Sequence, residues 1–230
     1  MLSSRALGLS ARATRCAADV WRIRERTERE VSAIFARLSA DLEASGAPQE
    51  LTRRARKCAA DELVHAVHCQ KIVEALDPGR APLRPDLAIA LGPSDPSPAR
   101  RALYASVALG CITESLSTAL LIVMRKAAEA PEVRDGLDVI LRDEVEHSRL
   151  GWAHLALAAE DGDVAWLAPH VPAMLRGALE TPPPNEALDD DERTSLRGWG
   201  ILPAAEVLAI VESTIATTIA PGLAQFGVKI

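Results

Sequence analysis

Aromatic residues are scarce in this chain of 230 residues. They make up 3% of the sequence, as four Trp, two Phe and one Tyr. Sheets favour aromatic and β-branched side chains, whereas the apolar residues here are rich in Ala and Leu, which favour helices. Because hydrophobic residues reach 48% of the composition, the chain can bury a sizeable core. The composition therefore predicts an all-α fold.

Cysteine is also rare, and its spacing excludes two kinds of structure. The four cysteines are Cys16, Cys58, Cys69 and Cys111, with no C-x-x-C pair. A disulfide framework or a thiolate zinc site needs closer, regular spacing, and so does a rubredoxin-like iron module. Free cysteines fit a reducing compartment, so we expect a cytoplasmic protein. Redox chemistry in it would need an external electron donor.

The chain has no excess of positive charge. Its net charge is -6 and its pI is about 5.5, so it lacks the basic surface of a nucleic-acid-binding protein. Residues 1–18 are an exception, because they hold three arginines and no acid. Such a segment fits a transit peptide or an amphipathic lead-in to the first helix, and we expect the lead-in.

One long apolar run, residues 102–124, reads ALYASVALGCITESLSTALLIVM and has a single charge, Glu114, near its middle. The run is long enough to cross a bilayer, but it is rich in Ala, Ser, Thr and Gly. A buried carboxylate without a partner is costly, so it is normally protonated, paired or bound to a metal. We expect a core helix rather than a membrane span, and no membrane partner.

Apolar periodicity and the Pro and Gly breaks predict four long helices. They cover residues 17–44, 48–76, 98–130 and 131–160. Residues 77–97, between the second and third helices, hold five prolines and two glycines. A connection of this length lets the second and third helices lie parallel in a four-helix bundle. We expect this bundle to occupy residues 1–162.

The remaining residues, 163–230, are predicted to form a helical extension packed on the bundle. Residues 163–180 indicate a short helix interrupted by prolines, and residues 203–220 a last helix. Between them, TPPPNEALDDDE at 181–192 is typical of a polar linker. The extension would either shape a substrate pocket at one end of the bundle or pack against a second subunit.

Two of the predicted helices carry the same motif, D-E-x-x-H. It occurs as DELVH at residues 61–65 and as DEVEH at residues 143–147. A Glu and a His three residues apart project from one face of a helix and can bind one ion. Both pairs lie on the apolar stripe of their helix, where unpaired polar groups are costly. The candidate ligands from the two motifs are Glu62, His65, Glu144 and His147.

Glu114 can belong to the same metal site as these two motifs. A di-metal site in a four-helix bundle takes one Glu from each of two helices and a Glu-x-x-His from each of the others. The third helix supplies Glu114, and the first offers Glu25, Glu28 or Glu30. We favour Glu28, which lies nearer the apolar stripe, and keep Glu30 as the alternative. The predicted ligand set is Glu28, Glu62, His65, Glu114, Glu144 and His147.

The donor atoms of this set indicate which metals it would bind. Four carboxylates carry four negative charges, which neutralise two divalent ions. Mixed oxygen and nitrogen donors suit two iron ions, or manganese or a mixed metal pair. The set lacks the thiolates of structural zinc sites, although zinc bound by carboxylates remains an alternative.

Through these two motifs and Glu28 and Glu114, roughly residues 17–160 resemble the ferritin-like di-iron carboxylate superfamily. The D-E-x-x-H form resembles rubrerythrin-like oxidases and di-iron oxygenases more than storage ferritins, which generally lack the second histidine. The resemblance implies a non-haem di-iron oxidoreductase that activates O2 and oxidises a small organic substrate. It also implies that Asp61 and Asp143 orient the ligating histidines from outside the ligand set.

Two other functions stay open at this point. One is a ferroxidase that handles or stores iron, which would require an assembly enclosing a cavity. The other is a non-catalytic helical bundle whose internal carboxylates pair with Arg or Lys, although the predicted stripes hold few cations. A homodimer is compatible with the oxidoreductase and with the non-catalytic bundle, whereas a monomer or dimer would argue against iron storage.

Overall fold

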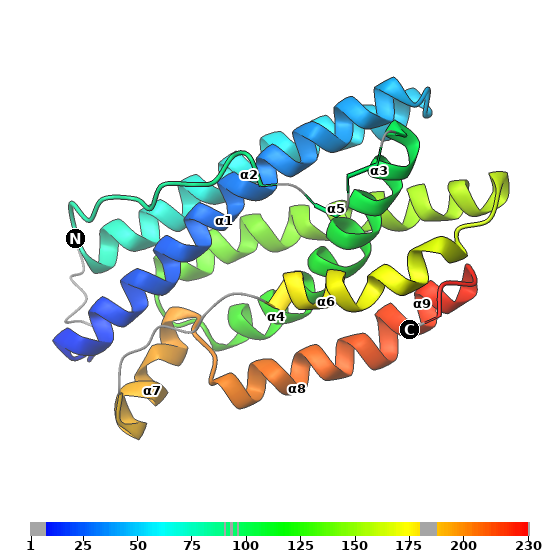
Figure 1. Cartoon of the computed structure of the whole chain (residues 1–230). Coiled ribbons are helices and arrows are strands. Elements are labelled where there is room, and N and C mark those ends of the chain that lie inside the picture. The colour runs from blue at the N-terminus through cyan, green and yellow to red at the C-terminus, as the bar shows by residue number, and fades with distance from the viewer. Residues whose placement is uncertain (1–7, 90, 93, 96, 180–187, 230) are drawn as a thin grey trace.

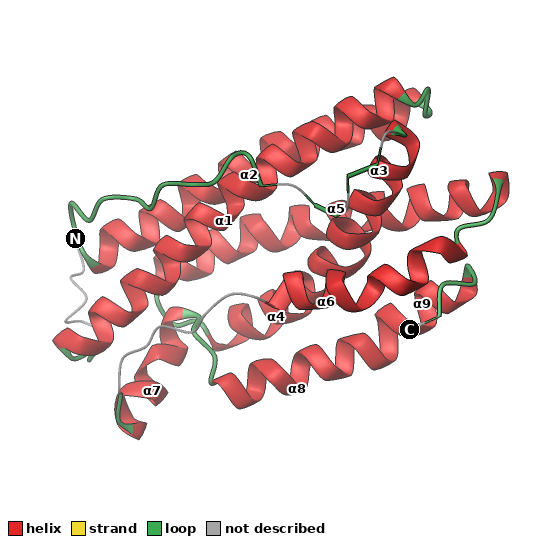
Figure 2. Ribbon diagram, viewed as in Figure 1, coloured by secondary structure: helices red, strands yellow, loops and turns green. Residues whose placement is uncertain are grey.

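The computed structural model describes residues 8–89, 91–92, 94–95, 97–179 and 188–229. These residues form helices joined by loops, and none of them lies in a strand (Figure 2). The prediction of an all-α fold is therefore confirmed. Residues 1–7, in the Arg-rich lead-in, lie outside the described part of the chain.

The first two helices are α1 (Ala11–Ala44) and α2 (Gln49–Leu76). α1 begins at Ala11 rather than at residue 17, because the side chain of Ser10 accepts a hydrogen bond from the first turn and caps it. The turn between the helices contains Gly46 with φ of +73°, a conformation that favours glycine. The helices pack against each other in antiparallel directions (Figure 1).

The third long segment is continuous but not uniformly α-helical. It consists of α3 (Pro98–Ala105), the π-helical segment η2 (Ser106–Thr113) and α4 (Glu114–Ala127). The sequence predicted one regular helix here. A π-helical stretch widens the backbone and often occurs at functional sites, and this one ends directly before Glu114.

The fourth long helix, α5 (Pro131–Asp161), approaches η2 very closely. A Cβ atom added to Gly110 of η2 would lie 2.7 Å from the backbone of Gly151 in α5. No real side chain fits at that distance, so the two glycines allow the backbones to touch. This contact fixes where η2 and the start of α4 sit against α5.

Figure 1 shows the course of the chain through these segments. The described residues of the connection after α2 run back along the outside of α1 and α2, and α2 and the α3–η2–α4 segment point the same way. α1 packs on α2, and α2 packs on α5. α5 in turn packs on α4 and η2, and α3 packs on α1. The four segments therefore enclose a common interior.

The extension after α5 is helical and shares its core with the four long segments. Its elements are η3 (Ala165–His170), α6 (Val171–Leu179), α7 (Asp190–Leu196), η4 (Arg197–Trp199), α8 (Ala204–Thr214), η5 (Ile215–Ile219) and α9 (Ala220–Gln225). Buried residues such as Val211 and Leu223 pack in one cluster with Val107 and Leu155. The indole N–H of Trp21 donates to a carbonyl of the extension at 3.0 Å.

The predicted polar linker at 181–192 is wrong at its C-terminal end. Asp189 and Glu192 form a capping box that begins α7, because each side chain accepts a hydrogen bond from the backbone N–H of the other. Residues 181–187 of that prediction lie outside the described residues.

Two helical stretches are long and apolar enough to cross a membrane by length and composition. In Pro98–Ala127 the most apolar window has a mean hydropathy of 1.9 and is 56% buried inside the protein. In Ala204–Gln225 the values are 1.6 and 17%. The first stretch is the run noted in the sequence, whereas the second, which contains Glu206 and Glu212, was expected only as a last helix.

Candidate metal centre

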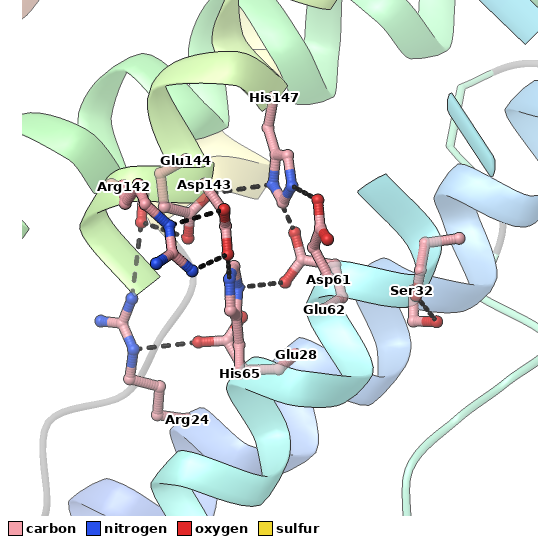
Figure 3. Close-up of polar contacts among 12 residues, drawn as sticks. Arg24, Glu28, Ser32, Asp61, Glu62, His65, Arg142, Asp143, Glu144 and His147 are labelled. Atoms are coloured by element: carbon pink, nitrogen blue, oxygen red, sulfur yellow. Dashed lines mark hydrogen bonds and ion pairs between the residues drawn. The ribbon is translucent and has the colours of Figure 1, made fainter. Parts of the chain in front are cut away.

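The structure brings the six predicted ligands together in the interior enclosed by the four long segments. Figure 3 labels each of them except Glu114. Each of them is at most 5% exposed. They come from α1, α2, α5 and the first residue of α4. The residues are Glu28, Glu62, His65, Glu114, Glu144 and His147.

The six residues form two overlapping groups. In each group, one ligand atom from every member lies within 4.8 Å of the others. The first group is Glu28, Glu62, His65 and Glu144, and the second is Glu62, Glu114, Glu144 and His147. Glu62 and Glu144 belong to both groups. The arrangement therefore offers two adjacent positions for a cation, with two carboxylates placed to bridge them.

The two oxygens of Glu62 contact different histidines. Its Oε1 lies 2.9 Å from Nδ1 of His147, and its Oε2 lies 3.2 Å from Nδ1 of His65. Glu144 Oε2 lies 3.2 Å from the same Nδ1 of His147. Both imidazoles thus turn Nδ1 toward Glu62 and Nε2 toward an aspartate (Figure 3).

Several buried ligand atoms have no hydrogen bond of good geometry to any described residue. Four of them face the cluster: Glu62 Oε1, Glu114 Oε1, Glu144 Oε2 and His147 Nδ1. His65 Nε2, on the outer side of its ring, is a fifth. An unsatisfied buried polar atom costs about 1–3 kcal/mol, and more when it is charged. Metal ions would satisfy the four atoms that face the cluster at once, so the residues present fit a pair of divalent cations.

The aspartates of the two motifs contact the histidines across the helix interface. Asp61 of α2 places Oδ2 3.3 Å from Nε2 of His147 in α5. Asp143 of α5 places Oδ2 3.5 Å from Nε2 of His65 in α2. Each motif therefore places its aspartate beside the imidazole of the other motif. The resemblance implied an orienting role for both aspartates, and the structure places them where they can perform it.

The three candidates on α1 have different surroundings. Glu28 belongs to the first group of potential ligands. Glu25 is also buried but lies 2.8 Å from Nε of Arg29, and Glu30 accepts a hydrogen bond from the backbone N–H of Asp86. Only Glu28 of these three reaches the cluster.

A cation beside the cluster was not anticipated from the sequence. Arg24 lies one turn before Glu28, and its Nε is 3.0 Å from Oε1 of that carboxylate. Its Nη2 is 3.5 Å from the hydroxyl of Ser117, which lies 3.4 Å from Oε1 of Glu144. The four-residue spacing between Arg24 and Glu28, which favours an ion pair on a helix, was the available signal.

The chain was also compared with known proteins. Neither the family models, nor the curated proteins, nor the solved structures gave a match. Function is therefore inferred from the donor set itself. Carboxylates and imidazoles together suit iron and manganese, and four carboxylates balance two divalent ions.

The electrostatics of the cluster without metal are strained. Burial, only partly offset by Arg24, raises the pKa of Glu28 well above its ordinary value. Burial and the charges of Glu144 and Glu62 do the same to the pKa of Glu114. Burial opposes ionisation of Glu62, but its close contacts with the two histidines outweigh it and lower its pKa to about 2. Burial opposes protonation of His147, but its contacts with Cys58 and the carboxylates raise its pKa.

These shifts predict that metal binding releases protons. Glu28 and Glu114 must ionise to bind a cation, and His147 must lose its proton, while all three pKa values are raised without metal. Raising the pH therefore favours binding, by up to about tenfold per pH unit for each proton released. Calorimetric titration with Mn²⁺ from about pH 6 to about pH 8, in buffers of different ionisation enthalpy, measures the protons. A Mn²⁺ affinity that does not change with pH would contradict these pKa shifts.

A cavity of about 240 Å³ adjoins the cluster. Its polar end is formed by Arg24 and four of the carboxylates, and apolar residues of α1 and α4 form most of its wall. Leu179 of α6 and Val211 of α8 complete the lining. The C-terminal extension thus contributes to the space beside the cluster, which is one of the two roles expected for it.

Proposed function

We propose that the chain is a ferritin-like di-iron oxidase or oxygenase that activates O2 and oxidises a small organic substrate. The observation that carries the proposal is the pair of overlapping Glu and His groups that share Glu62 and Glu144. The order of the helices supports it, because the long connection at 77–97 leaves α2 parallel to the α3–η2–α4 segment (Figure 1), as in ferritin-like bundles.

The chain's own residues have separable tasks in this proposal. Glu62 and Glu144 would bridge two ions, with Glu28 and His65 on one side and Glu114 and His147 on the other. A bound pair of ferrous ions would supply electrons for the reduction of O2, and an external electron donor would return the iron to the ferrous state. Asp61 and Asp143 hold the imidazoles with Nδ1 toward the metals.

The adjoining cavity favours an organic substrate over iron storage. Its walls away from the carboxylates are mainly apolar, including Ile23, Leu120 and Met124. A route that delivers iron ions would be lined by polar or acidic side chains, whereas an apolar cavity excludes water and accepts carbon-containing molecules. This observation is the reason for placing ferroxidase second.

Anaerobic reconstitution with ferrous iron followed by exposure to O2 tests the proposal. The expected result is rapid O2 consumption by the iron-loaded protein and none by the zinc-loaded protein, because Zn²⁺ has no redox chemistry. Full iron loading without O2 consumption would contradict the proposed activity. Continued uptake of iron as a mineral by a large assembly would favour ferroxidase instead.

A further inference from the structure

The charges around the cluster are not all equivalent. The outer carboxylates already have surface partners, since Asp61 pairs with Lys57 and Asp143 with Arg142. Glu25 is paired with a neighbouring arginine as well. Four negative charges remain inside, on Glu28, Glu62, Glu114 and Glu144. Two divalent cations would cancel those four charges.

One positive charge, on Arg24, is then left over. In the metal-free protein Arg24 lies 3.0 Å from Glu28, but its Nε makes no hydrogen bond of good geometry with any described residue. Its remaining contact, to the hydroxyl of Ser117, is long at 3.5 Å. Once Glu28 binds a cation, its charge is shared with the metal and attracts Arg24 less.

The surroundings of Arg24 make this surplus charge expensive. Its side chain is only 23% exposed, and it lines the cavity beside apolar residues such as Val20, Ile23 and Leu120. A partly buried cation in apolar surroundings is stabilised by an anion that pairs with it. Arginine suits carboxylates in particular, because its planar guanidinium forms two parallel hydrogen bonds with them.

We propose that Arg24 anchors the carboxylate of a small apolar carboxylic acid, which binds in this cavity beside the metal pair. This inference rests on the proposed function and names its substrate class. The cavity, at about 240 Å³, is smaller than the roughly 300–1,000 Å³ that holds drug-sized ligands, so the acid is small. The apolar walls receive its hydrocarbon part, and the cationic end near the metals selects the anion.

Binding of benzoate and of its neutral analogue benzamide to the Mn²⁺-loaded protein tests the inference without turnover. Calorimetry is expected to show at least about tenfold tighter binding of benzoate, as befits one charge-assisted pair. The preference is expected to vanish in the metal-free protein, where Arg24 keeps its contact with Glu28 and no metal ions add positive charge to the cluster. Equal binding of the two probes to the loaded protein would overturn the inference.

The variant Arg24→Gln tests whether the carboxylate of benzoate binds at Arg24. This variant is expected to lose benzoate affinity by about tenfold or more and to leave benzamide affinity unchanged, whereas Arg24→Lys keeps part of the preference. Arg22→Gln, on the same helix and paired with Asp19, is the matched control and is expected to bind both probes normally. Undiminished benzoate binding in Arg24→Gln would place the anion on the metals instead and overturn the inference.

Metal analysis of the same samples separates the two proposals. Two Mn²⁺ per chain in the wild type with no benzoate preference contradicts the role of Arg24 alone. No Mn²⁺ in the wild type contradicts the metal centre and the anchor together. If Arg24→Gln fails to fold or to load, the comparison of benzoate with benzamide on the wild-type protein still supports or overturns the inference.

Discussion

Glu62→Gln is expected to abolish the binding of both metal ions. Glu62 belongs to both groups of ligands and directs one oxygen to each histidine, so its loss removes a donor and a negative charge from both positions. Glutamine has nearly the same shape, so the packing around the 1% exposed side chain is kept. Glu144→Gln is expected to act in the same way. Elemental analysis after reconstitution with Fe²⁺ or Mn²⁺ measures the outcome.

Variants at the unshared ligands are expected to have a smaller effect. Glu28→Gln affects only the first group and Glu114→Gln only the second, so each is expected to retain about one ion per chain. Glu30→Gln is the matched control on α1, because Glu30 bonds to the loop instead of the cluster, and it is expected to load fully. Loss of metal in Glu30→Gln but not in Glu28→Gln would contradict the assignment on α1.

Metal loading is expected to raise the unfolding temperature strongly. Without metal, the cluster buries four carboxyl groups and several unsatisfied polar atoms, and the native state alone can present all the ligands. At a free metal concentration about 1,000 times Kd, each site adds about 4 kcal/mol to the free energy of unfolding. For a chain of this size, 1 kcal/mol corresponds to about 2–4 °C. We therefore expect a rise of about 8 °C or more, measured by scanning calorimetry.

The same variants provide the control for this stabilisation. Glu114→Gln is expected to change the Tm of the metal-free protein little, because burial and the neighbouring carboxylates raise the pKa of Glu114 and so already disfavour its ionised form. Glu62→Gln is expected to lose the metal-dependent rise. A rise of wild-type size in Glu62→Gln would show that the metal stabilises the protein from another site.

Much of the helical organisation could be predicted from the sequence. The breaks at Gly46 and Pro131 and the proline-rich connection at 77–97 place the four long segments to within a few residues, apart from the start of α1. The six candidate ligands could also be selected from the sequence. Two D-E-x-x-H motifs on apolar helix faces, and a single charge, Glu114, within an apolar run, are rare patterns. Local spacing encodes which face of a helix a residue occupies, and that sufficed here.

What the sequence did not show depends on contacts between distant segments. The π-helical segment before Glu114 accompanies the approach of Gly110 to Gly151, which links α5 to η2 and has no local pattern. The crossing of Asp61 to His147 and of Asp143 to His65 likewise depends on how α2 and α5 pack. Arg24 was overlooked because an arginine near the core is usually expected to extend its charge to solvent.

Binding of two metal ions, bridged by shared carboxylates, is the property on which the proposed function depends. Anaerobic titration of the metal-free protein with ferrous iron, followed by elemental analysis after removal of free metal, tests it most directly. We predict two irons per chain in the wild-type protein and almost none in Glu62→Gln. No bound iron, or iron that Glu62→Gln retains at the wild-type level, would contradict this prediction.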